Sequence, residues 1–454
     1  MSTLEEDLRA AVGPGHVLAE PDLRVAYERD WTGRFGGPSR LVVRPADVAE
    51  VSAALRACHA HDAPVVPQGG NTGMVGGGVP RGGEVLVSLA RLSDLGPVDA
   101  ATLQVEAGAG TTLAALHAHA AAAGLEFGVD FGARDSATVG GMIATDAGGL
   151  RALRHGTMRA QVLGLEAVLA DGSVLRRLSG LPKDNAGYDL PALLCGSEGT
   201  LAVISRARLR LLPRMPARVT ALLAVAGVEA ALALVEALRR GAPSLCAADF
   251  MLDDGLDLVL RHRKLAAPLR ERAPAYVLAE CAALTDPTEE LSAAVEAAGV
   301  VRDAAVADDS AGRAALWGLR EALPEAIAAA GIPHKLDVGV PAAALAEFTA
   351  RVPGCVEAAA PGARVWIFGH LGDGNVHVNV VGPAPADEAV DEALLRLVAE
   401  LGGTISAEHG VGVAKARWIG LTRSDEELAA MRAIKRGLDP GGLLNPGAVL
   451  ERPT

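Results

Sequence analysis

The feature that most constrains the fold is a glycine-rich loop that directly follows a short apolar strand. Residues 67–78 hold six glycines in twelve positions, and Val65-Val66 has the pattern of the strand that enters them. Such a loop can turn consecutive backbone N–H groups toward one anion, which makes it a candidate cradle for a phosphate or pyrophosphate. A flexible surface loop is the alternative, but the Gln, Asn and Thr donors between the glycines favour phosphate binding.

Two further glycine clusters, at residues 132–149 and 196–200, lie in the same region of alternating strands and helices. Three loops suit one extended ligand that is touched by backbone along its length, and a dinucleotide such as FAD has that length. The chain contains neither G-x-G-x-x-G nor G-x-x-x-x-G-K-[ST], so a Rossmann NAD site and a P-loop are disfavoured.

Composition excludes several classes of protein. The 454 residues are 50% hydrophobic and 21% charged, which is long and apolar enough for two or three domains with buried cores. A net charge of −13 argues against nucleic-acid binding. The start of the chain is acidic, the five cysteines are scattered, and no apolar stretch predicts a membrane span, so we expect a cytoplasmic protein without disulfides.

The pattern of the chain predicts an α+β protein with three parts. Residues 1–213 alternate between strands and helices, including helices at 47–61 and 113–123 and a hairpin at 162–178 with a type I′ turn at Asp171-Gly172. Residues 214–400 form a second α+β domain, with strands at 219–225 and 276–280 and helices at 228–240 and 289–298, and a helix at 387–401 leads into the final segment. Residues 401–454 form a C-terminal segment with a helix that begins at a Ser424/Glu427 capping box.

Histidines gather in two short segments, 369–380 and 407–410. If Asp373-Gly374 is a two-residue turn, His370 lies opposite His377 and both share one face of a hairpin with Asn379. Two imidazoles at that separation can share a cation, and Glu408 can complete the open three-ligand set of catalytic zinc. A pair of hydrogen-bonded structural histidines is the alternative, and spacing alone does not decide between them.

The motifs PQGGNTGMVGG, ATVGGMIATDAGG and KDNAGYDLPALLCGSEGTLAVI together resemble the flavin domain of the vanillyl-alcohol-oxidase (PCMH-type) family of FAD proteins. The likeness runs from Asp30-Trp31 to Asn445-Pro446-Gly447 and is closest to FAD-linked D-2-hydroxyacid dehydrogenases. It implies a PCMH-type FAD-binding domain over residues 1–213, a substrate (cap) domain over 214–400, and C-terminal helices that pack back on the FAD domain.

The resemblance also implies the residues that bind FAD. Gln68, Gly69, Gly70, Asn71, Thr72 and Gly73 would hold the pyrophosphate. The flavin would be lined by Ser136, Thr138, Gly140, Gly141, Thr145 and Gly148, with Ile204 on the opposite side, and Asn445 would also bind the cofactor. Covalently flavinylated relatives often place a histidine in the first loop, where this chain has Asn71-Thr72, so we expect dissociable FAD. Asp146 replaces a usual Asn and Ala202 a usual Gly.

By the same resemblance, GHLGDGNVHVNV and AEHGVG match divalent-metal motifs. His370, His377 and Glu408 would bind the metal, with zinc as the first candidate, and His409 would be the catalytic base. Arg320, Lys335 and Asn379 would bind the substrate, although an exposed charge is the ordinary explanation for a lone Arg or Lys. Pro324 stands where relatives often have a hydroxyl residue.

The implied reaction is oxidation of a small anionic D-2-hydroxy acid, with D-2-hydroxyglutarate as the first candidate, by hydride transfer to flavin N5. Because the chain has no second redox motif, the reduced flavin would need an external acceptor such as an electron-transfer flavoprotein, a quinone or a dye. Dehydrogenation of D-lactate, glycolate or D-malate is an alternative. A non-catalytic flavin-binding subunit is another, and a flavin reductase lacks the expected NADPH signature.

Overall fold

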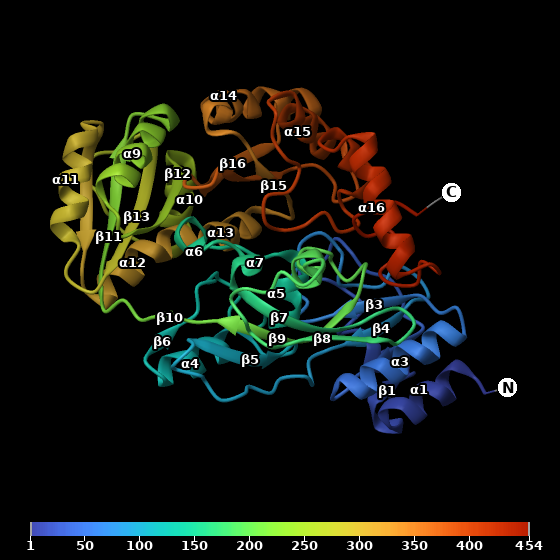
Figure 1. Cartoon of the computed structure of the whole chain (residues 1–454). Coiled ribbons are helices and arrows are strands. Elements are labelled where there is room, and N and C mark those ends of the chain that lie inside the picture. The colour runs from blue at the N-terminus through green and yellow to red at the C-terminus, as the bar shows by residue number, and fades with distance from the viewer. Residues whose placement is uncertain (1, 453–454) are drawn as a thin grey trace. The chain divides into compact units, whose positions relative to one another are not determined.

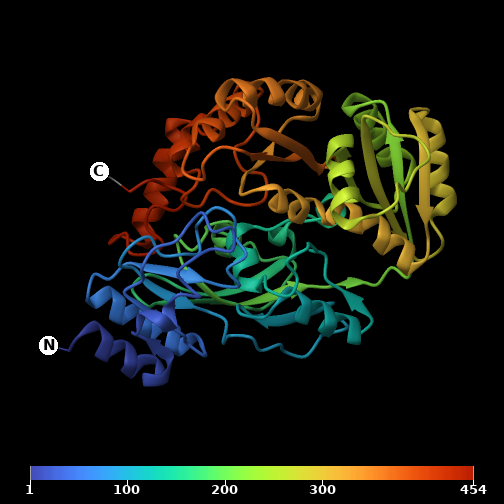
Figure 2. The same cartoon turned by 180° about the vertical axis from the view of Figure 1, so that it is seen from behind.

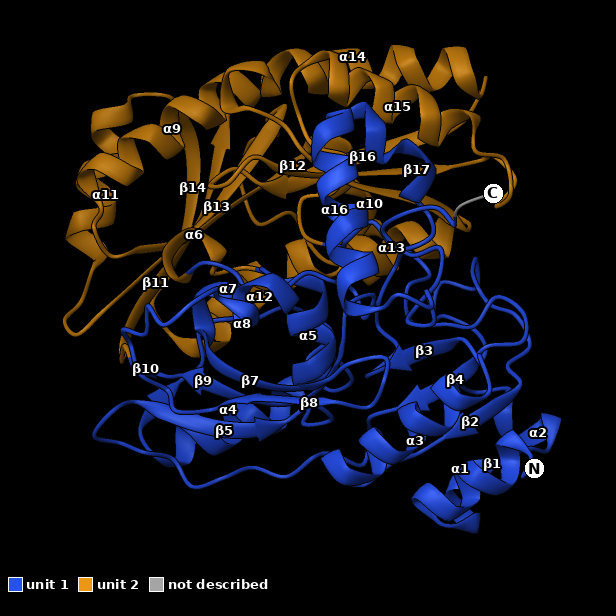
Figure 3. Ribbon diagram, turned by 45° about the vertical axis from the view of Figure 1, so that its right-hand side comes forward, with its two compact units in different colours: residues 1–149, 156–214, 409–454 blue, residues 150–155, 215–408 orange. Residues whose placement is uncertain are grey.

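The structure is a computed structural model that describes residues 2–452. It divides the chain into two compact units (Figure 3). Unit 1 comprises Met1–Gly149, Gly156–Arg214 and His409–Thr454, and unit 2 comprises Leu150–His155 and Met215–Glu408. Both units are therefore assembled from segments that are separated in the sequence.

Unit 1 contains two four-stranded sheets. The first has the order β1-β2-β4-β3 with β2, β4 and β3 parallel, the second is the antiparallel sheet β5-β9-β7-β8, and β10 pairs with β6. The N-terminal helix lies along α3 (Figures 1 and 2). The strands are β1 (Val17–Leu18), β2 (Leu41–Val43), β3 (Val65–Gln68), β4 (Val85–Ser88), β5 (Gln104–Gly108), β6 (Leu125–Glu126), β7 (Val162–Val168), β8 (Val174–Arg177), β9 (Val203–Arg210) and β10 (Leu212–Pro213). The helices are α1 (Leu4–Val12), η1 (Pro14–His16), α2 (Pro21–Arg24), α3 (Val48–Ala60), α4 (Leu113–Ala122), α5 (Val139–Thr145), α7 (Met158–Gln161), α8 (Leu190–Leu194), η2 (Ala416–Leu421) and α16 (Asp425–Leu438).

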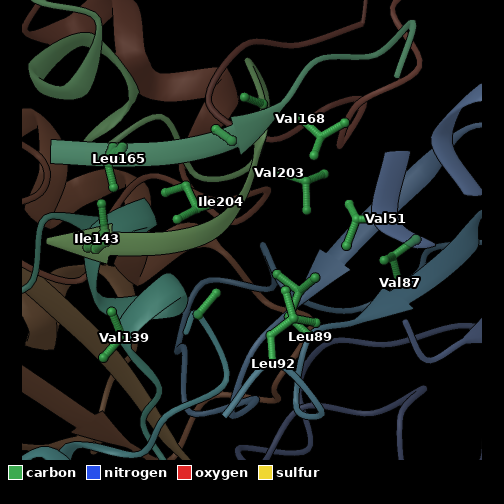
Figure 4. Packing of buried hydrophobic residues seen from close by; sticks show 14 of the residues in the cluster. Val51, Val87, Leu89, Leu92, Val139, Ile143, Leu165, Val168, Val203 and Ile204 are labelled. Atoms are coloured by element: carbon green, nitrogen blue, oxygen red, sulfur yellow. The ribbon is translucent and has the colours of Figure 1, made fainter. Parts of the chain in front are cut away.

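One hydrophobic core joins the two sheets of unit 1 to their helices. Val51 of α3 and Val87 of β4 belong to the same buried cluster as Val139 and Ile143 of α5 and Val203 of β9 (Figure 4). Valine and isoleucine suit the pleated surface of a strand and pack closely without aromatic rings. This packing fixes α5, whose N-terminus carries residues expected to line the flavin.

The hairpin expected at 162–178 is present, but its turn differs from the sequence-based prediction. The backbone N–H of Leu169 donates to the carbonyl of Ser173, and the Leu169 carbonyl accepts from the N–H of Gly172. The connection between the paired residues 169 and 173 therefore has three residues rather than two. Among the three residues of this connection, only Gly172 has a positive φ, of 83°. A type I′ turn needs positive φ at both central residues, so Asp171-Gly172 is not such a turn, and glycine instead occupies the single left-handed position of a longer loop.

Unit 2 is built on a seven-stranded antiparallel sheet with the order β14-β11-β13-β12-β16-β17-β15. Helices α10, α12 and α13 pack on one face, while α9, α11, α14 and α15 form a second layer (Figure 3). The strands are β11 (Ala217–Val225), β12 (Leu245–Leu252), β13 (Ala275–Ala283), β14 (Val301–Ala307), β15 (Pro333–Gly339), β16 (Arg364–His370) and β17 (Asn375–Val381). The helices are α6 (Ala152–His155), α9 (Val228–Gly241), α10 (Asp253–Arg263), α11 (Thr288–Ala298), α12 (Ser310–Glu321), α13 (Leu323–Ala330), α14 (Ala342–Ala359) and α15 (Ala389–Glu400).

The helices expected from apolar periodicity are confirmed in both units to within a few residues at their ends. The predicted capping box is also present: the Ser424 side chain accepts from Glu427 N, and the Glu427 side chain accepts from Ser424 N. Among the described residues, no helix combines the length and apolarity needed to cross a membrane.

Candidate functional site

In unit 1, the glycine loop after β3 lies directly against the segment that leads into α5. A Cβ added at Gly69 would overlap the hydroxyl of Thr138, and one added at Gly70 would overlap the carbonyl oxygen of Ser136. Both glycines are therefore required by close approach of the two loops. Two loops expected to bind FAD are thus brought together from positions about 70 residues apart in sequence.

Thr138 carries the observation that fits this pair of loops to a polar ligand. Its residue is only 4% exposed, and its Oγ1 has no hydrogen-bond partner among residues 2–452. Thr138 is the N-cap of α5, but its side chain accepts no capping hydrogen bond from the helix backbone. Leaving a buried hydroxyl unsatisfied costs about 1–3 kcal/mol, and a polar atom of a bound flavin would remove that cost.

Three other residues expected at the FAD site use their side chains to shape the loops. Gln68 donates to the carbonyl oxygens of Tyr27 and Gly78 and so closes the base of the glycine loop. Asn71 donates to the Arg29 carbonyl. Asn445 donates to the carbonyls of Gly77 and Glu198 and accepts from Arg81.

The remaining expected FAD residues lie near or within the same packed region. The hydroxyl of Thr145 donates to the Gly141 carbonyl one turn earlier in α5. Ile204 is a buried core residue of β9 (Figure 4). Gly140 approaches Ala109 too closely for a side chain. Trp31 donates its indole N–H to the Thr72 carbonyl. Gly73 has open space around its α-carbon, and Gly148 is buried just beyond α5.

Asp146, the residue that replaces a usual Asn, is already engaged by the protein. It ends α5 in the left-handed conformation with φ 52°, and its carboxylate accepts from the backbone N–H and the Nε of Arg159 at 2.9 and 3.0 Å. Asn and Asp both tolerate this conformation, so the exchange preserves the helix end. The added negative charge is balanced by Arg159.

In unit 2, the histidine hairpin forms, but with a register two residues away from the one expected. The turn spans residues 371–374, so His370 faces Asn375 and His377 faces Phe368. The prediction of a two-residue turn at Asp373-Gly374 is therefore wrong. Side chains alternate with a period of two, so a shift by two keeps both histidines on the same face as diagonal neighbours. Their ring centroids are 5.4 Å apart.

The two histidines and Glu408 converge on one point. The Nε2 atoms of His370 and His377 lie 3.7 and 3.5 Å from the same oxygen, Oε1 of Glu408. The three residues expected to bind a metal are thus assembled within unit 2, from β16, β17 and the segment after α15. Two imidazole nitrogens and one carboxylate oxygen have the donor composition of an open zinc site.

Asp337 is a neighbour of this centre that the sequence analysis did not identify. Ligand atoms of Asp337, His377 and Glu408 lie within 4.8 Å of one another, so Asp337 is close enough to be considered beside His370 as a donor. Both carboxylate oxygens of Asp337 already accept hydrogen bonds, from the side chain of Asn375 and from the backbone N–H groups of Ala407 and Glu408. Asp337 therefore fixes the segment that carries Glu408.

Asp249 of β12 is the second residue missed from the sequence. Its side chain is fully buried, and its Oδ1 lies 2.7 Å from Nδ1 of His370. Burial alone would lower the pKa of His370, but the carboxylates of Asp249 and Glu408 outweigh it and raise that pKa well above its usual value. The only sequence signal of Asp249 is a charged residue inside an otherwise apolar strand, whereas Asp337 lies in a strand that also holds His334 and Lys335 and gives no such signal.

The expected substrate residues lie around the same sheet face. On the central strand β17, Asn379 pairs with Lys335 of β15 on one side and with Trp366 of β16 on the other. Two residues earlier in β17, His377 pairs in the same way with Asp337 and Phe368. Directly paired residues share a face, so Lys335, Asn379 and His377 project to one side.

Arg320 of α12 is buried rather than exposed. Its Nε is 2.9 Å from Oδ2 of Asp249, and its guanidinium lies 4.4 Å from the centre of the Phe368 ring. Pro324 is the second residue of α13 (Leu323–Ala330), in the first turn, where the missing backbone N–H is not needed for the helix. The proline therefore has a structural role at the position where relatives often have a hydroxyl.

His409 directly follows Glu408 and begins the third segment of unit 1. Within unit 1, the residues after it are held by Glu198, which the sequence analysis did not single out within its glycine cluster. Glu198 accepts from the backbone N–H groups of Val411 and Gly412 at 2.7 and 2.8 Å. Burial raises the pKa of Glu198 to about 6, although these hydrogen bonds and the charge of Lys415 oppose the shift.

Two family models match the chain. The model of the FAD binding domain matches residues 39–177, and the model of the C-terminal domain of FAD linked oxidases matches residues 214–449. The chain therefore belongs to the FAD-linked oxidase family. As the sequence predicted, it is an FAD-dependent oxidoreductase.

Curated relatives match nearly the whole chain. The D-2-hydroxyglutarate dehydrogenase of Xanthomonas citri pv. viticola is 39% identical over 459 residues, which cover 98% of this chain and 96% of the relative. The mitochondrial D-2-hydroxyglutarate dehydrogenase of Bos taurus is 37% identical, over 98% of this chain and 84% of the relative.

Solved structures share the fold at lower sequence identity. A 4-ethylphenol oxidase from Gulosibacter chungangensis superposes with a TM-score of 0.75 at 18% identity, covering 99% of this chain and 97% of that one. p-Cresol methylhydroxylase gives 0.76 at 16% identity, with 99% and 96% coverage. The α+β fold with a PCMH-type FAD-binding domain is thereby confirmed.

Proposed function

We propose that the protein oxidises a D-2-hydroxy acid to the 2-oxo acid, with D-2-hydroxyglutarate as the first candidate. The observation that carries the proposal is the convergence of His370, His377 and Glu408 on a sheet face that also bears Lys335 and Asn379. The relatives that match nearly the whole chain are named for this substrate, which supports the choice.

In this proposal, His370, His377 and Glu408 hold a divalent metal, with zinc as the first candidate from the donor set. The metal would supply Lewis acidity to the substrate's hydroxyl and carboxylate oxygens. Bound FAD would supply the hydride acceptor. The first glycine loop contains no histidine to which the flavin could be attached, so we propose that FAD is bound without a covalent bond.

The chain's own residues then have separate tasks. His409 takes the hydroxyl proton, because an imidazole has an unperturbed pKa near neutrality. Arg320 and Lys335 bind carboxylate groups of the substrate, and Asn379 hydrogen-bonds beside them. The flavin is reoxidised by an external acceptor, for which an electron-transfer flavoprotein, a quinone and a dye are candidates. Five free cysteines support a reducing compartment such as the cytoplasm.

Pro324 favours a second candidate within the same reaction class. It offers no side-chain hydrogen bond at the position where relatives often have a hydroxyl. A smaller acid such as D-lactate, glycolate or D-malate would lose less binding free energy from this missing hydrogen bond than a longer dicarboxylate would.

The test is anaerobic reduction of the bound flavin by a panel of D- and L-2-hydroxy acids, followed by flavin absorbance. We expect bleaching by D-2-hydroxyglutarate and not by its L-enantiomer. Bleaching only by one of the smaller acids would establish the second candidate, and no bleaching by any acid in a flavin-loaded preparation would contradict the proposal.

A further inference from the structure

Asp249 links two residues to which the proposed function gives different tasks. Its strand neighbours are apolar, and the residue itself is 0% exposed, at the centre of the seven-stranded sheet. One carboxylate oxygen faces His370 at 2.7 Å and the other faces Arg320 at 2.9 Å. A buried carboxylate is costly unless it is paired, so its two partners explain how it is tolerated in this strand.

The contact with His370 determines which ring nitrogen can bind a metal. An ionised carboxylate accepts hydrogen bonds and cannot donate, so Nδ1 of His370 carries the proton that faces Asp249. The nitrogen left to bind a metal is then Nε2, the atom that points toward Oε1 of Glu408. Carboxylate partners commonly orient metal-binding histidines in this way.

The contact with Arg320 is of a different kind. The two charged atoms are within ion-pair distance, yet neither Nε of Arg320 nor Oδ2 of Asp249 has a well-aligned hydrogen bond among the described residues. Asp249 therefore holds the guanidinium by charge, with the Phe368 ring beneath it. The ion pair with Asp249 involves Nε of Arg320. It therefore leaves the two terminal Nη groups, which can bind a substrate carboxylate with two parallel hydrogen bonds.

We propose that Asp249 is a positioning residue that sets both the metal-binding nitrogen of His370 and the place of Arg320. One carboxylate thus couples the metal end of the site to the arginine that binds the substrate. The inference rests on the metal centre of the proposed function. It assigns no chemical step to Asp249, which acts through its two neighbours.

The test compares Asp249→Ala and Asp249→Asn with Asp391→Ala. Asp391 is the matched control, because it is a buried carboxylate of unit 2 that lies 2.5 Å from Nδ1 of another buried histidine, His334, which is not one of the proposed ligands. Metal-free protein is titrated with Zn²⁺ in competition with a chromophoric chelator, and FAD content and thermal unfolding are recorded for each variant.

We expect Asp249→Ala to weaken zinc binding by about 10–100-fold, and Asp249→Asn to recover much of that loss because its amide oxygen can still accept from Nδ1. Asp391→Ala should bind zinc as the wild type does. In steady-state assays, Asp249→Asn should raise KM more than it lowers kcat, because Arg320 has lost its countercharge.

The outcomes separate the two proposals. If the wild type takes up no zinc, the metal centre fails and the role of Asp249 fails with it. If the wild type binds zinc and Asp249→Ala binds it equally well, only the positioning role is overturned. If Asp249→Ala does not fold, Asp249→Asn decides: unchanged zinc affinity together with an unchanged KM would overturn the inference.

Discussion

Glu198 shows how one buried carboxylate can make stability depend on pH. Burial raises the pKa of its folded form from 4.5 to about 6, so the folded state binds this proton more tightly than the unfolded state does. Stability should therefore fall as the pH rises from about 4.5 to 6, by about 2 kcal/mol at most from this group. We expect Glu198→Gln to remove that part of the slope, as measured by urea unfolding between pH 4 and 8. Equal slopes in both proteins would show that Glu198 titrates normally.

Glu408 and His409 are adjacent in sequence, but we assign them different roles. His409→Asn should retain FAD and zinc and should bind substrate, while the rate of flavin reduction at saturating substrate falls by about 10²–10⁴-fold. Glu408→Ala should lose zinc as well, because two imidazoles alone hold the ion weakly. Stopped-flow absorbance and metal analysis of the two variants provide the measurement. Loss of zinc from His409→Asn would make His409 a ligand instead of a base.

Residue identity predicted which three side chains would converge better than it predicted the residues that hold them in place. His370, His377 and Glu408 stand in short motifs that can be read from the chain, and the structure brings them together. Asp249 and Asp337 are each the single acidic residue of their strand. Asp249 is partnered by Arg320 and His370, and Asp337 by the backbone of Glu408. Such contacts depend on strand order, which one sequence does not specify.

At the scale of elements, the turn between β16 and β17 is the feature that sets the histidine geometry. Gly374 has φ 78°, and a Cβ there would lie 2.5 Å from the carbonyl oxygen of Val340. We expect Gly374→Ala to destabilise the protein by about 1–3 kcal/mol and to weaken zinc binding, because the turn must shift. Urea unfolding and zinc competition measure the two effects.

Gly354, in the middle of α14, is the matched control for that substitution. A Cβ there meets nothing within 4 Å and its φ is ordinary, so Gly354→Ala should stabilise the protein by about 0.5–1 kcal/mol and leave zinc binding unchanged. If both alanine variants behaved alike, the constraint at Gly374 would not be the cause.

The same hairpin shows where pattern reasoning stops. Periodicity of two places His370, His377 and Asn379 on one face whichever even register forms, and that part of the prediction is confirmed. The register itself depends on the turn. Four residues form it because Gly374 donates to the His370 carbonyl and Val340 donates to Gly374, and the Val340 contact comes from the neighbouring strand's end. The sequence of the hairpin alone does not contain that partner.

At the scale of the whole molecule, the two units divide the candidate chemistry between them. The loops expected to hold FAD, including Thr138 with its unsatisfied hydroxyl, belong to unit 1, whereas His370, His377 and Glu408 belong to unit 2. The composition change near Pro213 coincides with the long passage from unit 1 to unit 2 after Arg214. The return at 408/409, and the short excursion at 150–155, carry no comparable change, since local composition does not report which distant segments pack together.

This division predicts that metal and FAD can be removed separately. Treatment with a chelator should abolish flavin bleaching by the D-2-hydroxy acid and leave bound FAD nearly unchanged, because no proposed metal ligand belongs to the FAD-binding loops. Dithionite should still reduce the flavin of the chelated protein, which shows that the flavin is present and competent. Zinc added back should restore bleaching by substrate. Full bleaching in a preparation shown to be metal-free would contradict the metal centre, and loss of FAD together with zinc would contradict the separation of the two sites.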